Sequence, residues 1–335
     1  MIKNTNILQD THGRNHAYLR ISLIERCNLR CTYCMPANGV PLSPKSHLMT
    51  YEEIYNIAKT FVKHGVTKIR LTGGEPLIRK DLPVILKKLA TLPVELSITS
   101  NAVIIDKFIE VLKANKVNKI NVSLDSLNAS KFTHITRRNE FKKVYNNIDL
   151  LVKEGFEVKI NAVLIKDFND NEIIEFIRFT ETRPVAVRFI EFMPFDGNKW
   201  DKSKMVSYAK VMEYVYKSFN KATVLRLKDA PNDTSKNYKI EGYKGSFAII
   251  SSVTNPFCDS CNRLRLTANG QLKNCLFSAS ESDLLTTLRS GSSIEPVIQK
   301  AVQAKFKIRG GMDTLDKLEE PKLHRKNRSM ITIGG

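Results

Sequence analysis

The sequence predicts an α/β protein, built as a partial, TIM-like (β/α)6 barrel with a smaller C-terminal α+β subdomain. Before residue 195, short runs rich in β-branched residues alternate with longer amphipathic segments. Strands that are each followed by a helix become parallel neighbours joined by right-handed crossovers. The alternation stops after residue 195, which predicts a boundary between 1–195 and 196–335. A doubly wound open sheet is the alternative architecture.

Each predicted element follows from its local pattern. Capping-box pairs precede two of the helices, Thr50 with Glu53 and Asn169 with Glu172. The predicted strands are Tyr18–Ile24, Lys68–Thr72, Val94–Thr99, Lys119–Leu124, Glu157–Leu164 and Ala186–Phe192. The predicted helices between them are Tyr51–His64, Leu82–Ala90, Ile105–Ala114, Phe141–Glu154 and Asn171–Thr180. In the subdomain we expect a linker and helix over Trp200–Phe219, hairpin-like strands at Thr223–Leu227 and Phe247–Ser251, and a helix near Ser282–Arg289.

Three cysteines with the spacing Cys27-x3-Cys31-x2-Cys34 follow the first predicted strand and so lie in a loop. Three thiolates can hold three irons of a four-iron cluster and leave the fourth without a protein ligand. Open metal positions are typical of catalytic sites. A zinc site would want a fourth Cys or His nearby, and His47 is distant and follows a Pro-rich loop. The plain alternative is a chance group of buried free thiols.

The remaining cysteines, Cys258, Cys261 and Cys275, form a second group of three. Two widely separated triads in a chain of 335 residues do not resemble the disulfide framework of a short secreted protein. No apolar segment approaches the length of a membrane span, and the first residues lack the apolar core of a secretory signal. Thiolate-bound iron needs a reducing environment, so we expect a cytoplasmic protein with no membrane partner.

The formal net charge of +19 indicates either a polyanionic partner or a lysine-rich surface. The lysines are spread along the chain, and neither aromatic stacking clusters nor an RNA-binding motif is present. We therefore expect no nucleic-acid partner. An RNA-binding zinc or iron–sulfur module is the alternative from another functional class.

The first cysteine loop, with Tyr33 just before its last cysteine, resembles the signature of the radical S-adenosylmethionine superfamily. The second predicted strand runs into Gly73-Gly74-Glu75-Pro76, which matches that superfamily's Gly-Gly-Glu-Pro motif. Paired glycines let a backbone approach a ligand closely, although a tight turn would use them too. The resemblance implies a four-iron cluster on Cys27, Cys31 and Cys34, and S-adenosylmethionine contacts at Tyr33, Gly74, Ser123 and Met193.

The second triad, in Cys258-x2-Cys261-x-Arg263-x-Arg265, is similar to the second cluster site of the GTP 3′,8-cyclase family of molybdenum cofactor biosynthesis. The terminal Gly334-Gly335 matches that family's double-glycine tail. The resemblance runs from about Tyr18 to the end of the chain. It implies a second four-iron cluster on Cys258, Cys261 and Cys275, whose free iron contacts guanine. The GTP contacts that it implies are Arg20, Arg70, Thr99, Lys159, Arg263, Leu264 and Arg265.

Several of these positions also make physical sense without the resemblance. Arg20 shares a strand face with Ser22, and Arg70 and Lys159 lie on other strands next to apolar neighbours. A cation on the inner face of a barrel is costly unless it meets an anion such as a triphosphate. One departure concerns the family's Thr-Thr-Asn-Gly, which here reads Thr99-Ser-Asn-Ala102. Ala102 lacks glycine's freedom at positive φ, which bears on the Thr99 contact.

The resemblance implies a lyase that cleaves S-adenosylmethionine reductively and uses the 5′-deoxyadenosyl radical to take the hydrogen from C3′ of GTP. Bond formation between C3′ and C8 then gives (8S)-3′,8-cyclo-7,8-dihydroguanosine 5′-triphosphate, with no side-chain acid or base required. The resemblance also implies a homodimer, an electron donor of the flavodoxin or ferredoxin type, and a downstream cyclic pyranopterin monophosphate synthase. The alternative within the superfamily is a peptide-modifying enzyme, although its auxiliary domain usually carries more cysteines.

Overall fold

The computed structural model describes residues 6–36, 38–324 and 327–334. Strand and helix alternate through the first part of the chain, as predicted. The strands are β1 (Tyr18–Ser22), β2 (Lys68–Thr72), β3 (Glu95–Ser100), β4 (Lys119–Ser123), β5 (Glu157–Leu164) and β6 (Ala186–Glu191). The helices are α1 (Tyr51–Lys63), α2 (Leu82–Leu89), α3 (Ile109–Ala114), α4 (Ala129–Thr136), α5 (Phe141–Lys153) and α6 (Ile173–Phe179).

The remainder of the chain adds strands at both edges of the same sheet. Its elements are α7 (Tyr208–Ser218), β7 (Val224–Arg226), β8 (Lys236–Ile240), β9 (Ser246–Ile250), β10 (Arg263–Leu266), β11 (Gln271–Lys273), β12 (Ser282–Asp283), α8 (Leu284–Arg289), α9 (Glu295–Gln303), α10 (Leu315–Glu319), α11 (Pro321–His324) and α12 (Met330–Ile333). Within the described residues the strand order is β12-β11-β10-β1-β2-β3-β4-β5-β6-β9-β8-β7. The boundary at 195/196 stays a prediction, because the sheet continues across it.

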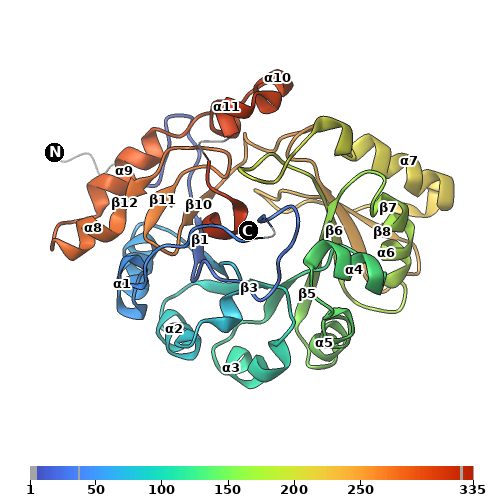
Figure 1. Ribbon diagram of the computed structural model, residues 1–335, viewed down its shortest axis with the longest axis horizontal. Coiled ribbons are helices and arrows are strands. Elements are labelled where there is room, and N and C mark those ends of the chain that lie inside the picture. The colour runs from blue at the N-terminus through green and yellow to red at the C-terminus, as the bar shows by residue number, and fades with distance from the viewer. Residues whose placement is uncertain (1–5, 37, 325–326, 335) are drawn as a thin grey trace.

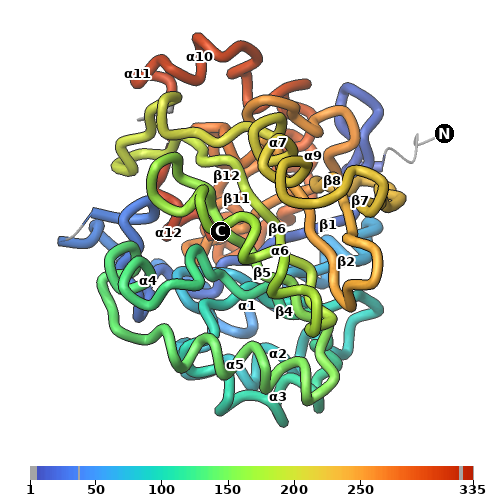
Figure 2. The backbone as a smooth tube through the Cα atoms, turned by 90° about the vertical axis from the view of Figure 1, so that its right-hand side faces the viewer, coloured from blue at the N-terminus to red at the C-terminus, as the bar shows by residue number. Residues whose placement is uncertain are grey.

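The strand order decides between the two predicted architectures. β1 to β6 lie side by side in chain order, and β10 and β9 continue the parallel pairing at either side. A doubly wound sheet would reverse its order at a switch point, so the partial barrel is confirmed. Figure 1 shows the helices α1, α2, α3, α5 and α6 around the outside of the curved sheet. In Figure 2 the C-terminal α10 and α11 lie at the end opposite α2, α3 and α5.

The predicted capping box is confirmed at α1 and is wrong before α6, the fifth predicted helix. Thr50 and Glu53 form the predicted capping box, with both reciprocal hydrogen bonds present. The second predicted box is wrong, because Asn169 makes no cap hydrogen bond. Its amide donates to the carbonyls of Asp125 and Val163, 2.7 and 2.9 Å away. Tertiary partners therefore compete successfully with the local cap.

Two further differences concern elements that the sequence pattern did not reveal. Helix α4 was not predicted, although Asn128 caps it by accepting hydrogen bonds from two backbone N–H groups. The predicted hairpin-like runs Thr223–Leu227 and Phe247–Ser251 both contain strands, and each strand pairs antiparallel with β8, which was not predicted.

One hydrophobic core connects the two parts of the chain. Leu19 of β1, Leu264 of β10 and Ile298 of α9 are all buried in the same cluster. Alternation along β6 sends Phe189 to this core, while Arg188 on the opposite face lines an internal cavity. None of the helices in the described ranges has the length and apolar character that crossing a bilayer requires.

The core face of β6 can be tested with Phe189→Ala. Phe189 is fully buried and packs edge-on against Phe176 of α6, with ring centroids 6.1 Å apart. We expect the free energy of unfolding to fall by about 3–5 kcal/mol in anaerobic denaturant titrations. Val84→Ala is the control, because Val84 is 42% exposed and its loss should change stability by less than about 0.5 kcal/mol. Equal effects of the two substitutions would contradict this assignment of the core.

Candidate active site

Two adjoining cavities lie inside the curved sheet. The larger has a volume of about 250 Å³ and is lined by strand residues and by the second cysteine segment. The smaller, of about 130 Å³, is lined by the first cysteine loop and the turn at Gly73 and Gly74. The residues that line both are Tyr33, Thr99, Ser123, Asp125 and Met330. The two cavities are therefore parts of one hollow.

The strand directions place the two cysteine triads at opposite ends of this hollow. Cys27, Cys31 and Cys34 follow the C-terminal end of β1, whereas Cys258 and Cys261 precede the N-terminal end of β10. β10 and β1 are parallel, so these ends are opposite. Cys275 joins the second triad because β11 runs back antiparallel to β10. A five-residue strand spans about 16 Å, which leaves room for a substrate between the triads.

The thiols of the first triad are protonated when they hold no metal. Burial raises the pKa of Cys27 to about 11 and that of Cys34 to about 12, and it raises the pKa of Cys31 well above its ordinary value. Tyr33 donates a hydrogen bond to Asp125, 2.8 Å away, which ties the cysteine loop to the end of β4. Metal binding would have to displace the thiol protons.

The second triad lies in positive surroundings. Burial acts to raise the pKa of Cys261, but the charges of Arg263 and Lys305 outweigh it and lower that pKa to about 6. The Lys305 Nζ atom lies 3.6 Å from the Cys261 Sγ atom. The Arg309 backbone N–H donates to the Cys258 Sγ atom at 3.4 Å. Burial nevertheless raises the pKa of Cys258, so the positive charges at this end favour the thiolate form of Cys261 in particular.

Three arginines lie side by side between the triads. Arg265, Arg20 and Arg70 are in register across β10, β1 and β2. In the described part of the chain, no carboxylate forms an ion pair with any of them. The Arg20 Nε atom is buried without a hydrogen-bond partner, and burial lowers the pKa of Arg70 to about 10. Adjacent like charges are destabilising, so a bound anion would stabilise this row.

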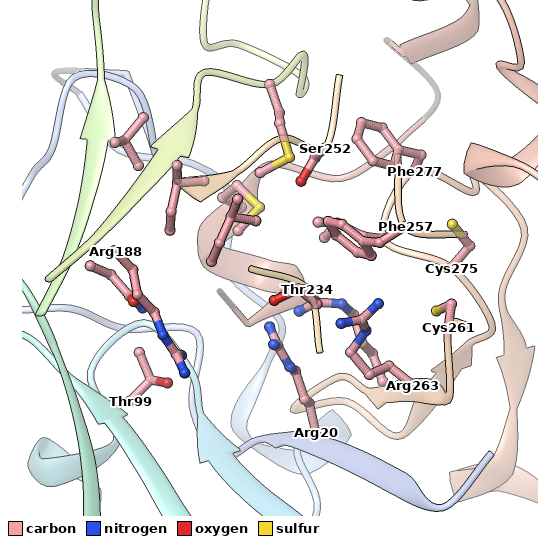
Figure 3. Close-up of a pocket in the computed structure, with 18 of the residues that line it drawn as sticks. Arg20, Thr99, Arg188, Thr234, Ser252, Phe257, Cys261, Arg263, Cys275 and Phe277 are labelled. Carbon is pink, nitrogen blue, oxygen red and sulfur yellow. The ribbon is translucent and has the colours of Figure 1, made fainter. Parts of the chain in front are cut away.

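Two more arginines point toward the same space. Figure 3 shows Arg188 from β6 and Arg263 from β10 directed toward the region that Arg20 also enters. The Arg263 guanidinium lies over the Phe257 ring, 4.7 Å from its centroid. Neither has a carboxylate partner among the described residues. A ligand with several phosphate oxygens matches this set of donors.

The Gly-Gly-Glu-Pro turn holds the first cysteine loop against β2. A Cβ atom at Gly74 would lie 2.1 Å from the Arg26 carbonyl oxygen, so only glycine fits. The Glu75 carboxylate accepts hydrogen bonds from the Leu77 and Asn101 backbone N–H groups and from the Ser100 hydroxyl, at 2.7–3.0 Å. Close packing against the Arg26 backbone therefore requires glycine at this turn, whether or not the turn also contacts a ligand.

The departure at Ala102 leaves the loop shape intact. Ala102 adopts the left-handed conformation expected of glycine, with φ of 59°. Its N–H donates to Ser100 Oγ at 2.9 Å, and its carbonyl accepts from Asn147 at 2.7 Å. These bonds offset a conformational cost of about 1–2 kcal/mol. Thr99 accordingly still lines both cavities.

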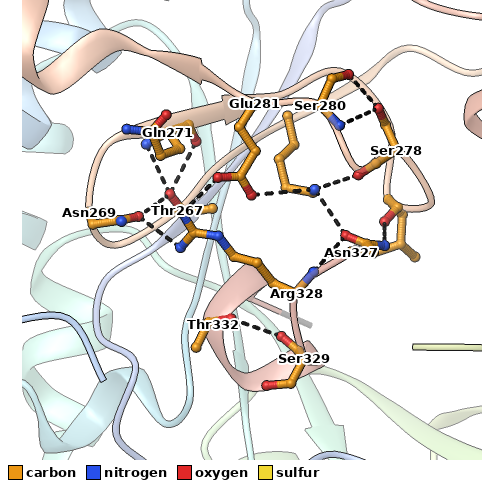
Figure 4. Close-up of polar contacts among 12 residues, drawn as sticks. Thr267, Asn269, Gln271, Ser278, Ser280, Glu281, Asn327, Arg328, Ser329 and Thr332 are labelled. Carbon is orange, nitrogen blue, oxygen red and sulfur yellow. Dashed lines mark hydrogen bonds and ion pairs between the residues drawn. The ribbon is translucent and has the colours of Figure 1, made fainter. Parts of the chain in front are cut away.

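The C-terminal segment enters the hollow. Met330 of α12 lines both cavities, and the Arg265 Nη1 atom donates to the Gly334 carbonyl at 2.6 Å. Figure 4 shows the segment anchored to the β11–β12 region, where Arg328 pairs with Glu281 at 2.6 Å. The fully buried Lys273 donates to the Asn327 side chain at 3.0 Å. Gly335 lies outside the described residues.

Most of the predicted site residues line the hollow, and two do not. Lys159 forms an ion pair with Glu157 at 2.5 Å and lines neither cavity. Leu264 is buried in the core, because it alternates with Arg263 and Arg265 on β10. The predicted residues that line one or both cavities are Arg20, Cys27, Cys31, Tyr33, Cys34, Arg70, Gly74, Thr99, Ser123, Met193, Cys258, Cys261, Arg263, Arg265 and Cys275. Their contacts with ligands stay predictions.

Several residues that line the cavities were not predicted from the sequence. Arg188 carries a usable signal, because it is a cation between Val187 and Phe189 in an apolar strand. Asn121 and Asn161 also face the cavity, and one amide atom of each is buried without a partner. No motif marks these asparagines, and only the strand alternation could have placed them.

Comparison with known proteins identifies the family. The chain is 45% identical over 337 residues to the mitochondrial GTP 3′,8-cyclase of Arabidopsis thaliana, covering 99% of this chain and 84% of that protein. It is 40% identical over 310 residues to the GTP 3′,8-cyclase of Listeria monocytogenes, covering 89% and 91%. The chain belongs to the GTP 3′,8-cyclase family. Family models match in two parts: the radical SAM superfamily at residues 21–180 and Molybdenum Cofactor Synthesis C at residues 185–310.

Longer relatives and distant structures complete the comparison. Molybdenum cofactor biosynthesis protein 1 of Drosophila melanogaster is 45% identical over 313 residues. This chain spans 55% of the length of that relative. The crystal structure of Streptococcus suis SuiB bound to S-adenosylmethionine superposes with a TM-score of 0.59 at 18% identity, over 83% of this chain and 67% of that one. At that identity the likeness shows the fold alone.

The cofactors of the GTP 3′,8-cyclase family are S-adenosylmethionine and four-iron four-sulfur clusters, and the two triads fit such clusters better than single ions. Among the described residues, no group of three or more His, Cys, Asp or Glu side chains is placed to hold one metal ion. Tetrahedral zinc would draw its sulfurs to within about 3.8 Å of one another. A cluster spreads its thiolates over several irons, so triads that do not converge on one ion suit it.

The buried carboxyl of Glu75 predicts a pH dependence of stability. Burial raises the pKa of Glu75 to about 7, although its hydrogen bonds oppose the shift. The folded state therefore holds this proton more tightly than the unfolded chain, and the resulting stabilisation is lost as pH rises from about 4.5 to 7. Relative to Glu75→Gln, the wild-type free energy of unfolding should fall by up to roughly 2 kcal/mol between pH 5 and pH 7.5.

Anaerobic unfolding of both proteins at several pH values measures this difference. Glu95→Gln is the matched control. Although burial acts to raise the pKa of Glu95, Lys119 and Lys68 lower it to about 2, so its contribution should stay constant over the same range. A difference between wild type and Glu75→Gln that does not change with pH would show that Glu75 is ionised throughout.

Proposed function

We propose that the protein is a GTP 3′,8-cyclase, which converts GTP to (8S)-3′,8-cyclo-7,8-dihydroguanosine 5′-triphosphate in the first step of molybdenum cofactor biosynthesis. One observation carries the proposal: a hollow with a cysteine triad at each end and a row of arginines, without carboxylate partners in the described ranges, between them. A triphosphate supplies the negative charge that this row needs, whereas a peptide substrate does not. The family membership agrees with this assignment.

The residues of the chain divide between two cofactor sites and one substrate site. Cys27, Cys31 and Cys34 would hold the first cluster, and Cys258, Cys261 and Cys275 the second. Tyr33, Gly74, Ser123 and Met193 would surround S-adenosylmethionine. When bound, the first cluster and S-adenosylmethionine supply an electron and a radical that abstracts hydrogen. GTP would be held by Arg20, Arg70, Thr99, Arg263 and Arg265, as well as by the second cluster. Lys159 and Leu264 line neither cavity, so their proposed contacts with GTP would require Lys159 to leave Glu157 and Leu264 to contribute its backbone.

The contribution of the protein to the reaction is mainly positional. The arginine row fixes the phosphates, so that the ribose lies between the phosphates and the first triad, where C3′ must meet the radical carbon. Burial of the hollow keeps water away from reactive carbon centres. We further propose that the enzyme works as a homodimer in a reducing, cytoplasmic environment. It would receive electrons from a flavodoxin or ferredoxin and pass its product to cyclic pyranopterin monophosphate synthase.

Anaerobic turnover tests the proposed function. The protein is reconstituted with iron and sulfide and given dithionite, S-adenosylmethionine and GTP carrying deuterium at C3′. The cyclisation removes the hydrogen at C3′ and takes up one electron and one proton. We therefore expect a product whose chromatographic retention differs from that of GTP. Mass spectrometry should find the deuterium in 5′-deoxyadenosine. Formation of unlabelled 5′-deoxyadenosine with GTP unchanged would refute the proposal.

Substitution of the β10 arginines should separate cleavage of S-adenosylmethionine from cyclisation of GTP. Arg263→Ala and Arg265→Ala each remove a phosphate ligand far from the first triad, so 5′-deoxyadenosine should still form while cyclisation is abolished. Both products are quantified by chromatography. The control is Arg183→Ala, because Arg183 pairs with Asp149 at the surface, 2.7 Å away, and should leave cyclisation unchanged. Normal cyclisation by either β10 variant would remove that arginine from the substrate site.

A further inference from the structure

Lys305 is a buried cation beside the second triad, and no motif marks it. Its exposed fraction is 4%, and its Nζ atom lies 2.9 Å from the Arg263 carbonyl oxygen and 3.6 Å from the Cys261 Sγ atom. No carboxylate in the described ranges forms an ion pair with it. A buried ammonium is costly unless it faces an anion. The carbonyl satisfies one N–H, so the Cys261 thiolate is the anion that remains.

The N-terminal segment holds Lys305 in this position. The Arg14 Nη1 atom donates to the carbonyls of Cys258 and Lys307, both at 2.8 Å, and its Nη2 atom donates to the Phe306 carbonyl at 2.9 Å. The buried Asp10 carboxylate in turn pairs with Arg14 at 2.6 Å. The segment that carries Lys305 is thus bonded to the cysteine segment itself, which limits how far the ammonium can move from the thiolate.

Neighbouring groups do not cancel the charge of Lys305. His16 lies in the same cluster, and burial together with the charge of Lys305 lowers the pKa of His16 to about 4, so it is neutral near pH 7. The Asp10 carboxylate is already engaged by Arg14 and by His16. Arg309 adds a backbone N–H bond to Cys258 from the same segment. The field at the triad therefore stays positive.

We propose that Lys305 is a positioning residue of the second cluster, which holds the Cys261 thiolate and raises the reduction potential of that cluster. The inference rests on the proposed function, because it requires a cluster on Cys258, Cys261 and Cys275. Reduction adds negative charge to a cluster, and a cation or N–H donor at a ligating sulfur stabilises that charge. Removing the ammonium should therefore make reduction harder.

The test compares Lys305→Met, which keeps the length of the side chain but removes its charge, with Lys305→Arg, which keeps the charge. Lys300→Met is the matched control on the exposed face of α9. Iron content is measured first, and reduction by dithionite is then followed by EPR at set potentials. Measurements use the holoenzyme and the full chain carrying Cys27→Ala, Cys31→Ala and Cys34→Ala, in which only the second cluster contributes.

We expect the reduction equilibrium of Lys305→Met to weaken about tenfold, a shift of about 59 mV to more negative potential for one electron, while Lys305→Arg and Lys300→Met match the wild type. An unchanged potential in Lys305→Met, with full iron content, overturns the inference and leaves the proposed function standing. Wild-type protein that binds only about four irons overturns the proposed function itself. Should Lys305→Met lose the cluster, Lys305→Gln is measured in the same way and decides by the same criterion.

Discussion

The hollow depends on one electrostatic constraint, the row of Arg265, Arg20 and Arg70 across three neighbouring strands. Parallel pairing fixes these cations side by side, and none has a carboxylate partner among the described residues. The fold tolerates the row because the rest of the β1, β2 and β10 core is apolar and well packed. A bound polyanion, as proposed, would recover this energetic cost, and the stability that the row gives up would become affinity for phosphate.

The pairing of β10 with β1 does more than place Arg265. It sets the N-terminal end of β10 at the far end of the hollow from the first cysteine loop, so segments more than half the chain apart in sequence line one hollow. The C-terminal segment reinforces this arrangement. Met330 lines both cavities, and Gly334 takes one donor of Arg265. The site is therefore complete only when the last strands and the last helix are folded in place.

Local patterns predicted β1 to β6 closely, because strand periodicity and helix amphipathicity are properties of short segments. They could not predict that β9 and β10 extend the sheet at both edges, since those pairings join residues far apart in sequence. The same limit explains the failed cap at Asn169, whose partners lie just after β4 and on β5, and the omission of Lys305. Lys305 depends on neighbours that only the folded chain brings together, whereas Arg188 carried a local signal that was not used. The cysteine motifs were found because their spacing is local.

The two ends of the hollow differ in a way that suits two different tasks. Near the first triad, burial together with the Asp125 carboxyl raises the pKa of Cys31, and burial together with the Glu75 carboxyl raises that of Cys27, so added negative charge is disfavoured there. Near the second triad, Arg263 and Lys305 favour it. With clusters at both ends, as proposed, the first would be the stronger reductant, which reductive cleavage of a sulfonium requires. The second would hold its electron more readily and could bind guanine without competing for the cofactor.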